Sequence, residues 1–164
     1  PKSKVNDYLF SFTKRLCFGS TLFNSNHLTL VHEIKSNDGK KSIPIRDNEV
    51  VLRYKVQEGT LNYWGAMHGG AIASLIDIST TVAITALDRT NRKNVSIELS
   101  SQYVAPIKPE VDVFVVCKIS KIGKTVAYTT CEVLDTEKLG TMATGSHTKA
   151  MLEGVWELEL NDKI

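Results

Sequence analysis

A histidine and two glycines stand a short distance before a lone carboxylate in the middle of the chain. His68, Gly69 and Gly70 are followed by six residues and then by Asp77, the only charged residue between Gly70 and Leu87. The apolar periodicity around them predicts a helix that begins near His68 and ends near Asp88. The first turn of a helix leaves backbone N–H groups unpaired, and glycines let a ligand approach them closely. Such a helix end can hold a carbonyl oxygen that is becoming an oxyanion.

The two faces of this predicted helix differ from those of a solvated helix. At about 100° per residue, one side gathers apolar residues, which we expect to face a sheet: Ile72, Leu75, Ile76, Ser79, Val82, Ala83, Ala86 and Leu87. The opposite side is small and uncharged except for Asp77: Gly70, Ala73, Ser74, Thr81 and Ile84. With no spare element in the monomer to cover this side, we expect a second subunit to cover it. Asp77 is then predicted to lie near a subunit interface, although a partly wetted groove is the alternative.

Gly69 and Asp77 are too far apart on one helix to serve one small group. Eight residues of helix separate them by roughly 12 Å. A site built from Gly69 of one subunit and Asp77 of the other removes this difficulty. The His-Gly-Gly pattern alone is weak, because glycines before a helix often serve only the turn and a lone histidine such as His68 is more often a structural hydrogen-bonding residue.

Strand-like segments dominate the chain after the helix. Val95–Ala105, Val111–Ile122, Thr125–Leu134 and Thr141–Leu152 have strand character, and the turns Gly123-Lys124 and 135–140 make the last three antiparallel neighbours. Before the helix, His27–Ile34 and the alternating Val50–Val56 are predicted strands, with a polar loop over Ser36–Asn48 between them. The economical α+β arrangement is an antiparallel sheet of about six strands wrapped around one central helix.

The segment Val5–Asn24 precedes these elements and is basic and aromatic. We expect a peripheral helix that packs Leu9, Phe12 and Leu16 onto the core, with binding to a membrane surface as the alternative. The predicted division of the chain is an N-terminal helical extension over 1–26, a main domain over 27–152 and a C-terminal tail over 153–164.

Composition limits the classes of function. The chain has 164 residues and a formal net charge of +2, so it fits one domain and carries no signature of nucleic-acid binding. Cys17, Cys117 and Cys131 form no Cys-x-x-Cys pair, which argues against a zinc site or a disulfide framework and favours a reducing compartment. The apolar window Ala71–Leu87 is too polar and slightly too short to predict a membrane span. Because the sequence starts at Pro1, a targeting segment before it stays open.

These residues together resemble a known family. The pattern begins with Asn62, which is followed after five residues by His-Gly-Gly and after six more by Asp77. Ser96, Gly123-Lys124-Thr125 and the stretch from Gly145 to Lys149 extend it. This pattern resembles the hotdog-fold acyl-CoA thioesterases, and more narrowly the PaaI-like branch with the thioesterase superfamily member 2 enzymes. The resemblance covers roughly 28–152. It implies the hotdog fold, a homodimer with active sites at the interface, and a homotetramer made of two dimers.

The resemblance also implies roles for individual residues. The Gly69 amide is expected to polarise the thioester carbonyl, and Asp77 of the neighbouring subunit to act as general base or nucleophile. Ser96 is expected to orient water, Asn62 to bind the water or the leaving group, and His68 to brace the Asn62 loop. The expected contacts with substrate and coenzyme A are Gly70, Tyr103, Lys121, Gly123, Lys124, Thr125 and Lys149.

The implied activity is hydrolysis of a fatty acyl-CoA or aryl-acyl-CoA, with no metal and no bound cofactor. A non-catalytic acyl-CoA sensor or scaffold and a hotdog dehydratase or hydratase are the alternatives. Tyr63 and Trp64 depart from the family by placing bulky aromatics beside Asn62, and the basic segment Arg89–Lys93 is a further candidate for a phosphate contact. Cytosol and mitochondrion both fit the expected chemistry.

Overall fold

The computed structural model describes residues 4–7, 9, 19–23, 25–109 and 111–155. Its strands are β1 (Leu28–Val31), β2 (Ile34–Lys35), β3 (Ser42–Ile43), β4 (Glu49–Tyr54), β5 (Arg92–Tyr103), β6 (Val113–Ile122), β7 (Val126–Asp135) and β8 (Thr141–Val155). One long helix, α2 (Gly69–Leu87), and a single 3-10 turn, η1 (Glu58–Thr60), lie between β4 and β5. The large sheet has six antiparallel strands in the order β1-β4-β6-β7-β8-β5.

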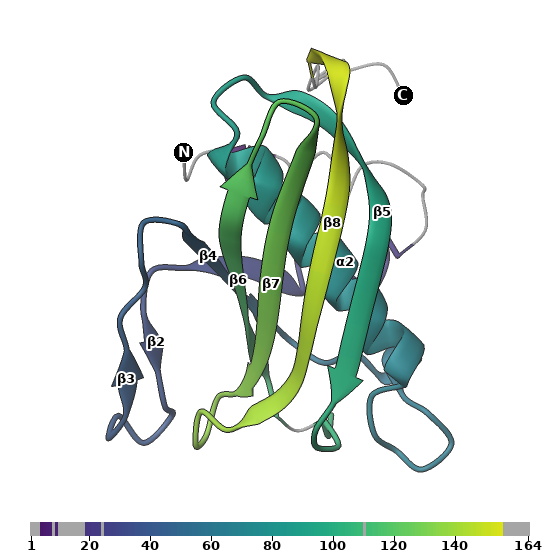
Figure 1. Cartoon of the computed structure of the whole chain (residues 1–164). Coiled ribbons are helices and arrows are strands. Elements are labelled where there is room, and N and C mark those ends of the chain that lie inside the picture. Colours follow the sequence, from purple (N-terminus) through teal and green to yellow (C-terminus); the bar gives the residue numbers. More distant parts are fainter. Residues whose placement is uncertain (1–3, 8, 10–18, 24, 110, 156–164) are drawn as a thin grey trace.

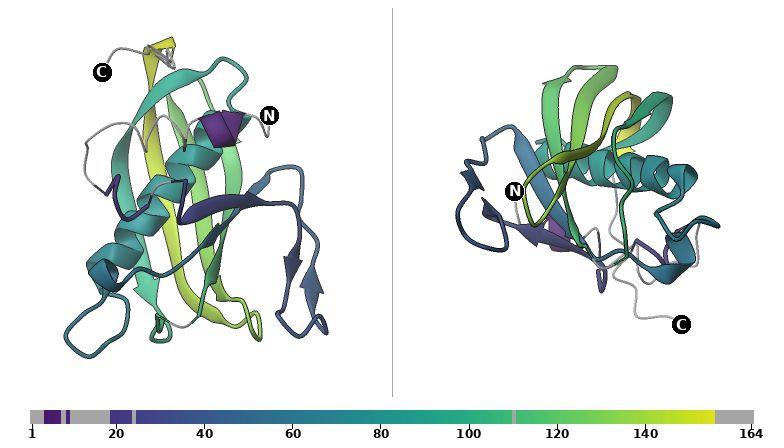
Figure 2. Two further views of the ribbon diagram at one scale, coloured as in Figure 1. Left: turned by 180° about the vertical axis from the view of Figure 1, so that it is seen from behind. Right: turned by 90° about the horizontal axis from the view of Figure 1, so that it is seen from below.

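The large sheet curves around α2, as the sequence predicted (Figure 1). Seen from below, the helix lies inside the curve of the strands (Figure 2). By length and mean hydropathy (19 residues, 1.6), α2 could cross a membrane, but 56% of its apolar window is buried inside the fold. It is therefore the core helix of this sheet.

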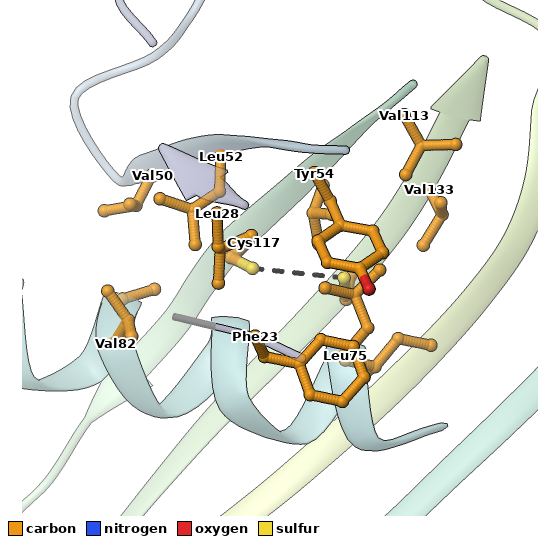
Figure 3. Packing of buried hydrophobic residues seen from close by; sticks show 14 of the residues in the cluster. Phe23, Leu28, Val50, Leu52, Tyr54, Leu75, Val82, Val113, Cys117 and Val133 are labelled. Carbon is orange, nitrogen blue, oxygen red and sulfur yellow. Dashed lines mark hydrogen bonds between the residues drawn. The ribbon is translucent and has the colours of Figure 1, made fainter. Parts of the chain in front are cut away.

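The core lies between α2 and the inner face of the sheet. Alternation along β4 turns Val50, Leu52 and Tyr54 toward the helix, and all three are buried there. Phe23 packs on Tyr54 with ring centroids 5.3 Å apart, next to Cys117 and Leu75 (Figure 3). Burying several such side chains supplies most of the stabilisation of the fold, at roughly 1.5–3 kcal/mol each.

The part of the chain before β4 differs from the expectation. The predicted strand His27–Ile34 is two strands, because β1 ends at Val31 and Ile34 begins β2. The predicted polar loop Ser36–Asn48 contains β3, which pairs with β2 as a separate two-stranded sheet. This arm covers Val51 on the outer face of β4 in a second apolar cluster with Ile34, Phe114 and Leu134.

The expected N-terminal helix is only partly within the described residues. Residues 4–7 and 9 are helical, and Val5 and Leu9 are buried in the main core. Phe12 and Leu16, which were expected on the same face, lie outside the described residues. At its C-terminal end, β8 continues to Val155, three residues beyond the predicted end of the last strand.

The prediction that only a second subunit could cover the far side of α2 is wrong for part of that side. Thr81 and Ile84 are buried within the single chain. Thr81 and Asp77 contact side chains of β5 and β8, because the sheet curls past the flank of the helix. A side chain added at Gly19 would contact Ile78, so the N-terminal segment also lies against the helix.

Candidate active site

Asp77 is the centre of the most polar cluster on α2. Its side chain is 43% exposed, and three groups lie around its Oδ1 atom. Ser96 Oγ is 3.4 Å away, His147 Nε2 3.6 Å and Lys149 Nζ 3.8 Å. Ser96, which the resemblance expected to orient water, therefore lies beside Asp77 of the same chain.

Pairing between the last two strands of the sheet brings these groups to Asp77. β5 and β8 are antiparallel neighbours, with Ser96 opposite Lys149. Because side chains alternate along a strand, Gly145, His147 and Lys149 share the face toward α2. A Cβ at Gly145 would lie 3.1 Å from Ile76 Cγ2 and 2.7 Å from the Ser100 carbonyl oxygen, so the missing side chain lets the helix approach β8.

His147 is fully buried, and both of its ring nitrogens have hydrogen-bond partners. Nδ1 lies 2.6 Å from Thr80 Oγ1, and Nε2 lies 2.9 Å from Ser96 Oγ. The tautomer of the ring decides which partner donates in each bond. Burial and then the charge of Lys149 lower the pKa of His147 to about 4, against the opposite effect of Asp77. The ring is therefore neutral near pH 7.

Lys149 lies inside the fold. Its side chain is 5% exposed, and its ammonium donates to Thr81 Oγ1 at 2.5 Å. Burial lowers the pKa of Lys149, while the charge of Asp77 acts in the opposite direction. The residue was expected among the coenzyme A contacts, but the structure has it beside Asp77, with its head group turned toward α2.

The N-terminus of α2 has one backbone donor left open. His68 is the N-cap, and its Nδ1 accepts the Gly70 N–H at 2.9 Å. The His68 carbonyl accepts the amides of Ala71 and Ile72. Among the described residues, the Gly69 amide has no acceptor. Tyr103 at the end of β5 donates to the Gly69 carbonyl at 3.1 Å, and its ring lies 3.3 Å from the place of a Gly69 Cβ.

Asn62 organises the loop before the helix. Its Oδ1 accepts the amides of Trp64 at 2.9 Å and Ala66 at 3.2 Å, which leaves the side-chain NH₂ as a donor for another group. The loop is joined to the helix start because the His68 amide donates to the Thr60 carbonyl. Tyr63 and Trp64 are 96% and 85% exposed at its tip.

The hairpin between β6 and β7 is a separate group of candidate residues. Gly123 donates to the Val126 carbonyl in the tight turn, and Lys121, Lys124 and Thr125 lie around it. Arg92 donates to the carbonyls of Gly123 at 3.1 Å and Lys124 at 2.7 Å. Of these residues, Arg92, Gly123 and Lys124 line a shallow groove of about 520 Å³. Its other lining residues are Leu87, Asp88, Arg89, Thr90 and Ile122.

Arg92 is engaged by the protein itself. It forms an ion pair with the buried Asp88 at 3.1 Å, besides its two bonds to the hairpin. Burial raises the pKa of Asp88, but hydrogen bonds from Arg92 and Thr90 outweigh it and lower the pKa below the usual value. Within the basic segment 89–93, Arg92 therefore holds the hairpin against the end of α2.

One chain thus contains three groups of predicted site residues. Asp77 lies with Ser96 and Lys149; Gly69 lies with His68, Gly70, Tyr103 and the Asn62 loop; the hairpin carries the remainder. Gly69 and Asp77 stay roughly 12 Å apart along the helix. Within the described ranges, no group of three His, Cys, Asp or Glu side chains could hold a metal ion.

Three residues of the Asp77 cluster were not among the sequence candidates. They are His147, Thr80 and Thr81. A signal for His147 existed, because it stands two residues after Gly145 and two before Lys149, in the period of one strand face. The two threonines gave no comparable signal, since hydroxyl side chains within an apolar helix are common.

Comparison with known proteins gives consistent relatives. Residues 65–141 match the model of the Thioesterase superfamily. Acyl-coenzyme A thioesterase 13 of Homo sapiens is 32% identical over 101 residues, which is 62% of this chain and 71% of that protein. The corresponding protein of Mus musculus is 30% identical over the same shares of the two chains.

Solved structures show the same fold. Zebra fish thioesterase superfamily member 2 superposes with a TM-score of 0.74 at 22% identity, covering 92% of this chain and 98% of that one. A hypothetical thioesterase protein of Streptococcus pneumoniae, determined with coenzyme A, has a TM-score of 0.64 at 19% identity, covering 80% and 89%. At these identities the likeness concerns the fold.

Proposed function

Because the chain belongs to the hotdog-fold thioesterase superfamily, we propose that it hydrolyses acyl-coenzyme A thioesters to a free acid and free coenzyme A. The observation that carries this proposal is the half-exposed Asp77, which has the hydroxyl of Ser96 3.4 Å from its carboxylate. A carboxylate open to solvent and next to a hydroxyl can hold and deprotonate a water molecule. Fatty acyl and aryl-acetyl groups are the proposed acyl classes.

The proposed reaction uses water as the second substrate and requires no metal or bound cofactor. Asp77 takes a proton from water as the water oxygen forms a bond to the thioester carbon. The carbonyl oxygen becomes an oxyanion, which the open Gly69 amide stabilises by a hydrogen bond. When the oxyanion collapses, the C–S bond breaks, the thiolate leaves as coenzyme A, and the proton returns to it. Direct attack by Asp77 is the variant of this mechanism with a covalent intermediate.

The N-terminal end of the helix has proposed supporting roles. His68 accepts the Gly70 amide and braces the helix end, so that the Gly69 amide is the donor left for substrate. The free NH₂ of Asn62 is a donor for the water or the leaving sulfur. Tyr63 and Trp64 are placed beside this donor and are proposed to border the acyl or pantetheine entrance.

A dimer is the proposed active unit, because Gly69 and Asp77 of one chain lie roughly 12 Å apart and cannot act on one small group. β5 is an edge strand of the sheet, Val95, Ile97 and Tyr103 are exposed along it, and the exposed Val104 follows directly after it. A long edge with exposed apolar side chains is a template for pairing with another chain. If two β5 strands pair antiparallel about a point between Leu99 and Ser100, Ser96 of one copy lies opposite Tyr103 of the other.

This pairing would complete two sites. Ser96 contacts Asp77, and Tyr103 contacts Gly69, so the Asp77 carboxylate of one copy would approach the Gly69 amide of the second. Pairing of dimers into a tetramer stays a prediction, which a native mass measurement can test.

Coenzyme A is proposed to bind at the β6–β7 hairpin. Lys121 and Lys124 can meet phosphate groups there, and the backbone of Gly123 and Thr125 allows close approach. Arg92 is proposed to fix the hairpin, because its guanidinium already bonds Asp88 and two hairpin carbonyls. Cytosol and mitochondrion both supply the substrate, and the free thiols of Cys117 and Cys131 fit either reducing compartment.

A thiol-release assay over acyl-CoAs of rising chain length, with a phenylacetyl thioester, tests the proposal. Asp77→Asn should lower hydrolysis by about a hundredfold or more while the fold is kept. Asp47→Asn is the matched control, because Asp47 is an exposed carboxylate away from the cluster. A wild-type protein that binds acyl-CoA without releasing thiol would favour the sensor alternative, and an active Asp77→Asn variant would refute the role of Asp77.

A further inference from the structure

A buried lysine beside the proposed general base has no explanation in the function above. Lys149 carries its ammonium under the sheet with 5% of the side chain exposed, 3.8 Å from Asp77 Oδ1. Burying an ammonium group costs several kcal/mol unless other groups compensate. A methionine would fill similar space at lower cost, so the charge itself points to a role.

The position of this charge is fixed by a short hydrogen bond. Thr81 Oγ1 accepts from Lys149 Nζ at 2.5 Å, and the Thr81 hydroxyl itself donates to the Asp77 carbonyl at 2.8 Å. Thr81 stands four residues after Asp77, one helical turn on the same side of α2. The ammonium is therefore fixed against the same turn that presents the carboxylate, on the side away from solvent.

We propose that Lys149 is a positioning residue for Asp77: its buried ammonium, fixed by Thr81, holds the carboxylate turned toward the water that it deprotonates. The proposal rests on the proposed function for its catalytic meaning. The direction of the carboxylate is a property of the folded protein and does not need turnover.

Few side chains other than Lys149 face the Asp77 carboxylate. From β8 these are His147 and Lys149, and from β5 it is Ser96, which does not titrate. The imidazole of His147 is neutral above about pH 4, because burial and Lys149 lower its pKa to about 4. Over the range from pH 5 upward, Lys149 is thus the positive charge closest to the carboxylate among the described residues.

The test compares Lys149→Met with two changes at its anchor. Lys149→Met removes the charge and keeps the buried stem. Thr81→Val removes the hydroxyl without changing the volume, and Thr81→Ser keeps the hydroxyl. Lys55→Met, at an exposed lysine directly after β4, is the matched control for loss of one positive charge. Thermal melting of each variant shows whether the fold is retained.

Two readouts separate this inference from the proposed function. The crystal structure of each variant without substrate shows which way the Asp77 carboxylate is turned. Thiol release at varied acyl-CoA concentration gives kcat and KM separately. In Lys149→Met the Asp77 carboxylate should leave its place beside Ser96, and kcat should fall by about tenfold or more with KM within about threefold of the wild type. Thr81→Val should show a smaller change, whereas Thr81→Ser and Lys55→Met should match the wild type.

An Asp77 carboxylate that keeps its wild-type position in folded Lys149→Met overturns the inference. If that variant does not fold, Thr81→Val decides, and a wild-type carboxylate position in Thr81→Val overturns it equally. A turned carboxylate in a protein that hydrolyses no acyl-CoA would support the inference and refute the proposed function. An active enzyme in which neither variant changes the Asp77 position would support the proposed function and overturn the inference.

Discussion

The Gly69 amide at the start of α2 can be tested by a substitution that removes this one hydrogen-bond donor and no other. Gly69 is the first residue of the helix, and the preceding His68 is extended with ψ 138°. Proline is favoured at the first helical position, and the residue before proline prefers this extended backbone. Gly69→Pro therefore deletes the N–H while preserving the helix start.

The expected magnitude follows from the number of donors left. The Gly70 amide bonds His68 Nδ1, and those of Ala71 and Ile72 bond the His68 carbonyl, so Gly69 is the only one of the first four without an acceptor among the described residues. Removing one oxyanion donor lowers kcat by about 10²–10³. Gly69→Pro should show this loss.

Gly69→Ala is the matched control for this variant. Both changes add a Cβ at 3.3 Å from the exposed Tyr103 ring, but alanine keeps the N–H. The assay is thiol release at saturating acyl-CoA, with thermal melting to confirm that both variants fold alike. If Gly69→Pro retains the kcat of Gly69→Ala within about threefold, the Gly69 amide does not stabilise the oxyanion and the reasoning fails.

Four further predictions concern the scaffold of the site and the buried thiols. Arg92→Met should destabilise the fold by about 2–4 kcal/mol, because the buried Asp88 loses its ion-pair partner; chemical denaturation measures this, and a loss below about 0.5 kcal/mol would contradict it. The pKa of Asp88 is lowered in the folded protein. Its contribution to stability is therefore complete above the pKa of the unfolded state, near about 4, and is lost as pH falls through the pKa of the folded state. Below about pH 4, the stability of Arg92→Met should fall less than that of the wild type. Gly145→Ala should cost about 1–3 kcal/mol, because its Cβ would lie 2.7 Å from the Ser100 carbonyl oxygen, and an unchanged melting temperature would show that the strand adjusts freely. In a Cys17→Ser background the native protein should not react with a thiol reagent within minutes, because burial and the contact with Cys131 raise the pKa of Cys117, whereas denaturant should release both thiols.

The elements that local patterns define were predictable from the sequence. The run Gly69–Leu87 has helical periodicity and no interior breaker, and α2 has these bounds. The hairpins that join β6, β7 and β8 follow from short turns between long alternating strands, and their pairing is antiparallel as predicted. The family motif, which spans the Asn62 loop, α2 and β5, singled out Asp77, Gly69 and Ser96.

The parts that depend on contacts between distant segments were not predictable in this way. An irregularity in β5 between Ser96 and Glu98 changes which residues face the helix, so Ser96 and Leu99 both turn inward although they are three residues apart. The inward direction of Lys149 depends on the curl of β8 past α2, whereas the family resemblance had implied a contact between Lys149 and coenzyme A. The β2–β3 arm is likewise held by apolar contacts with distant strands, and strands of two residues leave no recognisable pattern in the sequence.

We propose that each active site takes Asp77 from one copy of the chain and the Gly69 amide from another. Mixing Asp77→Asn with Gly69→Pro under conditions in which subunits exchange tests it most directly, since each variant is nearly inactive alone. In a mixed dimer one site would receive both changes and the other would receive neither. The shared-site account predicts recovery to about a quarter of wild-type activity in an equal mixture, because half of the dimers are mixed and half of their sites are intact. Activity no higher than the mean of the two separate variants, in a mixture shown to contain mixed dimers, would contradict it.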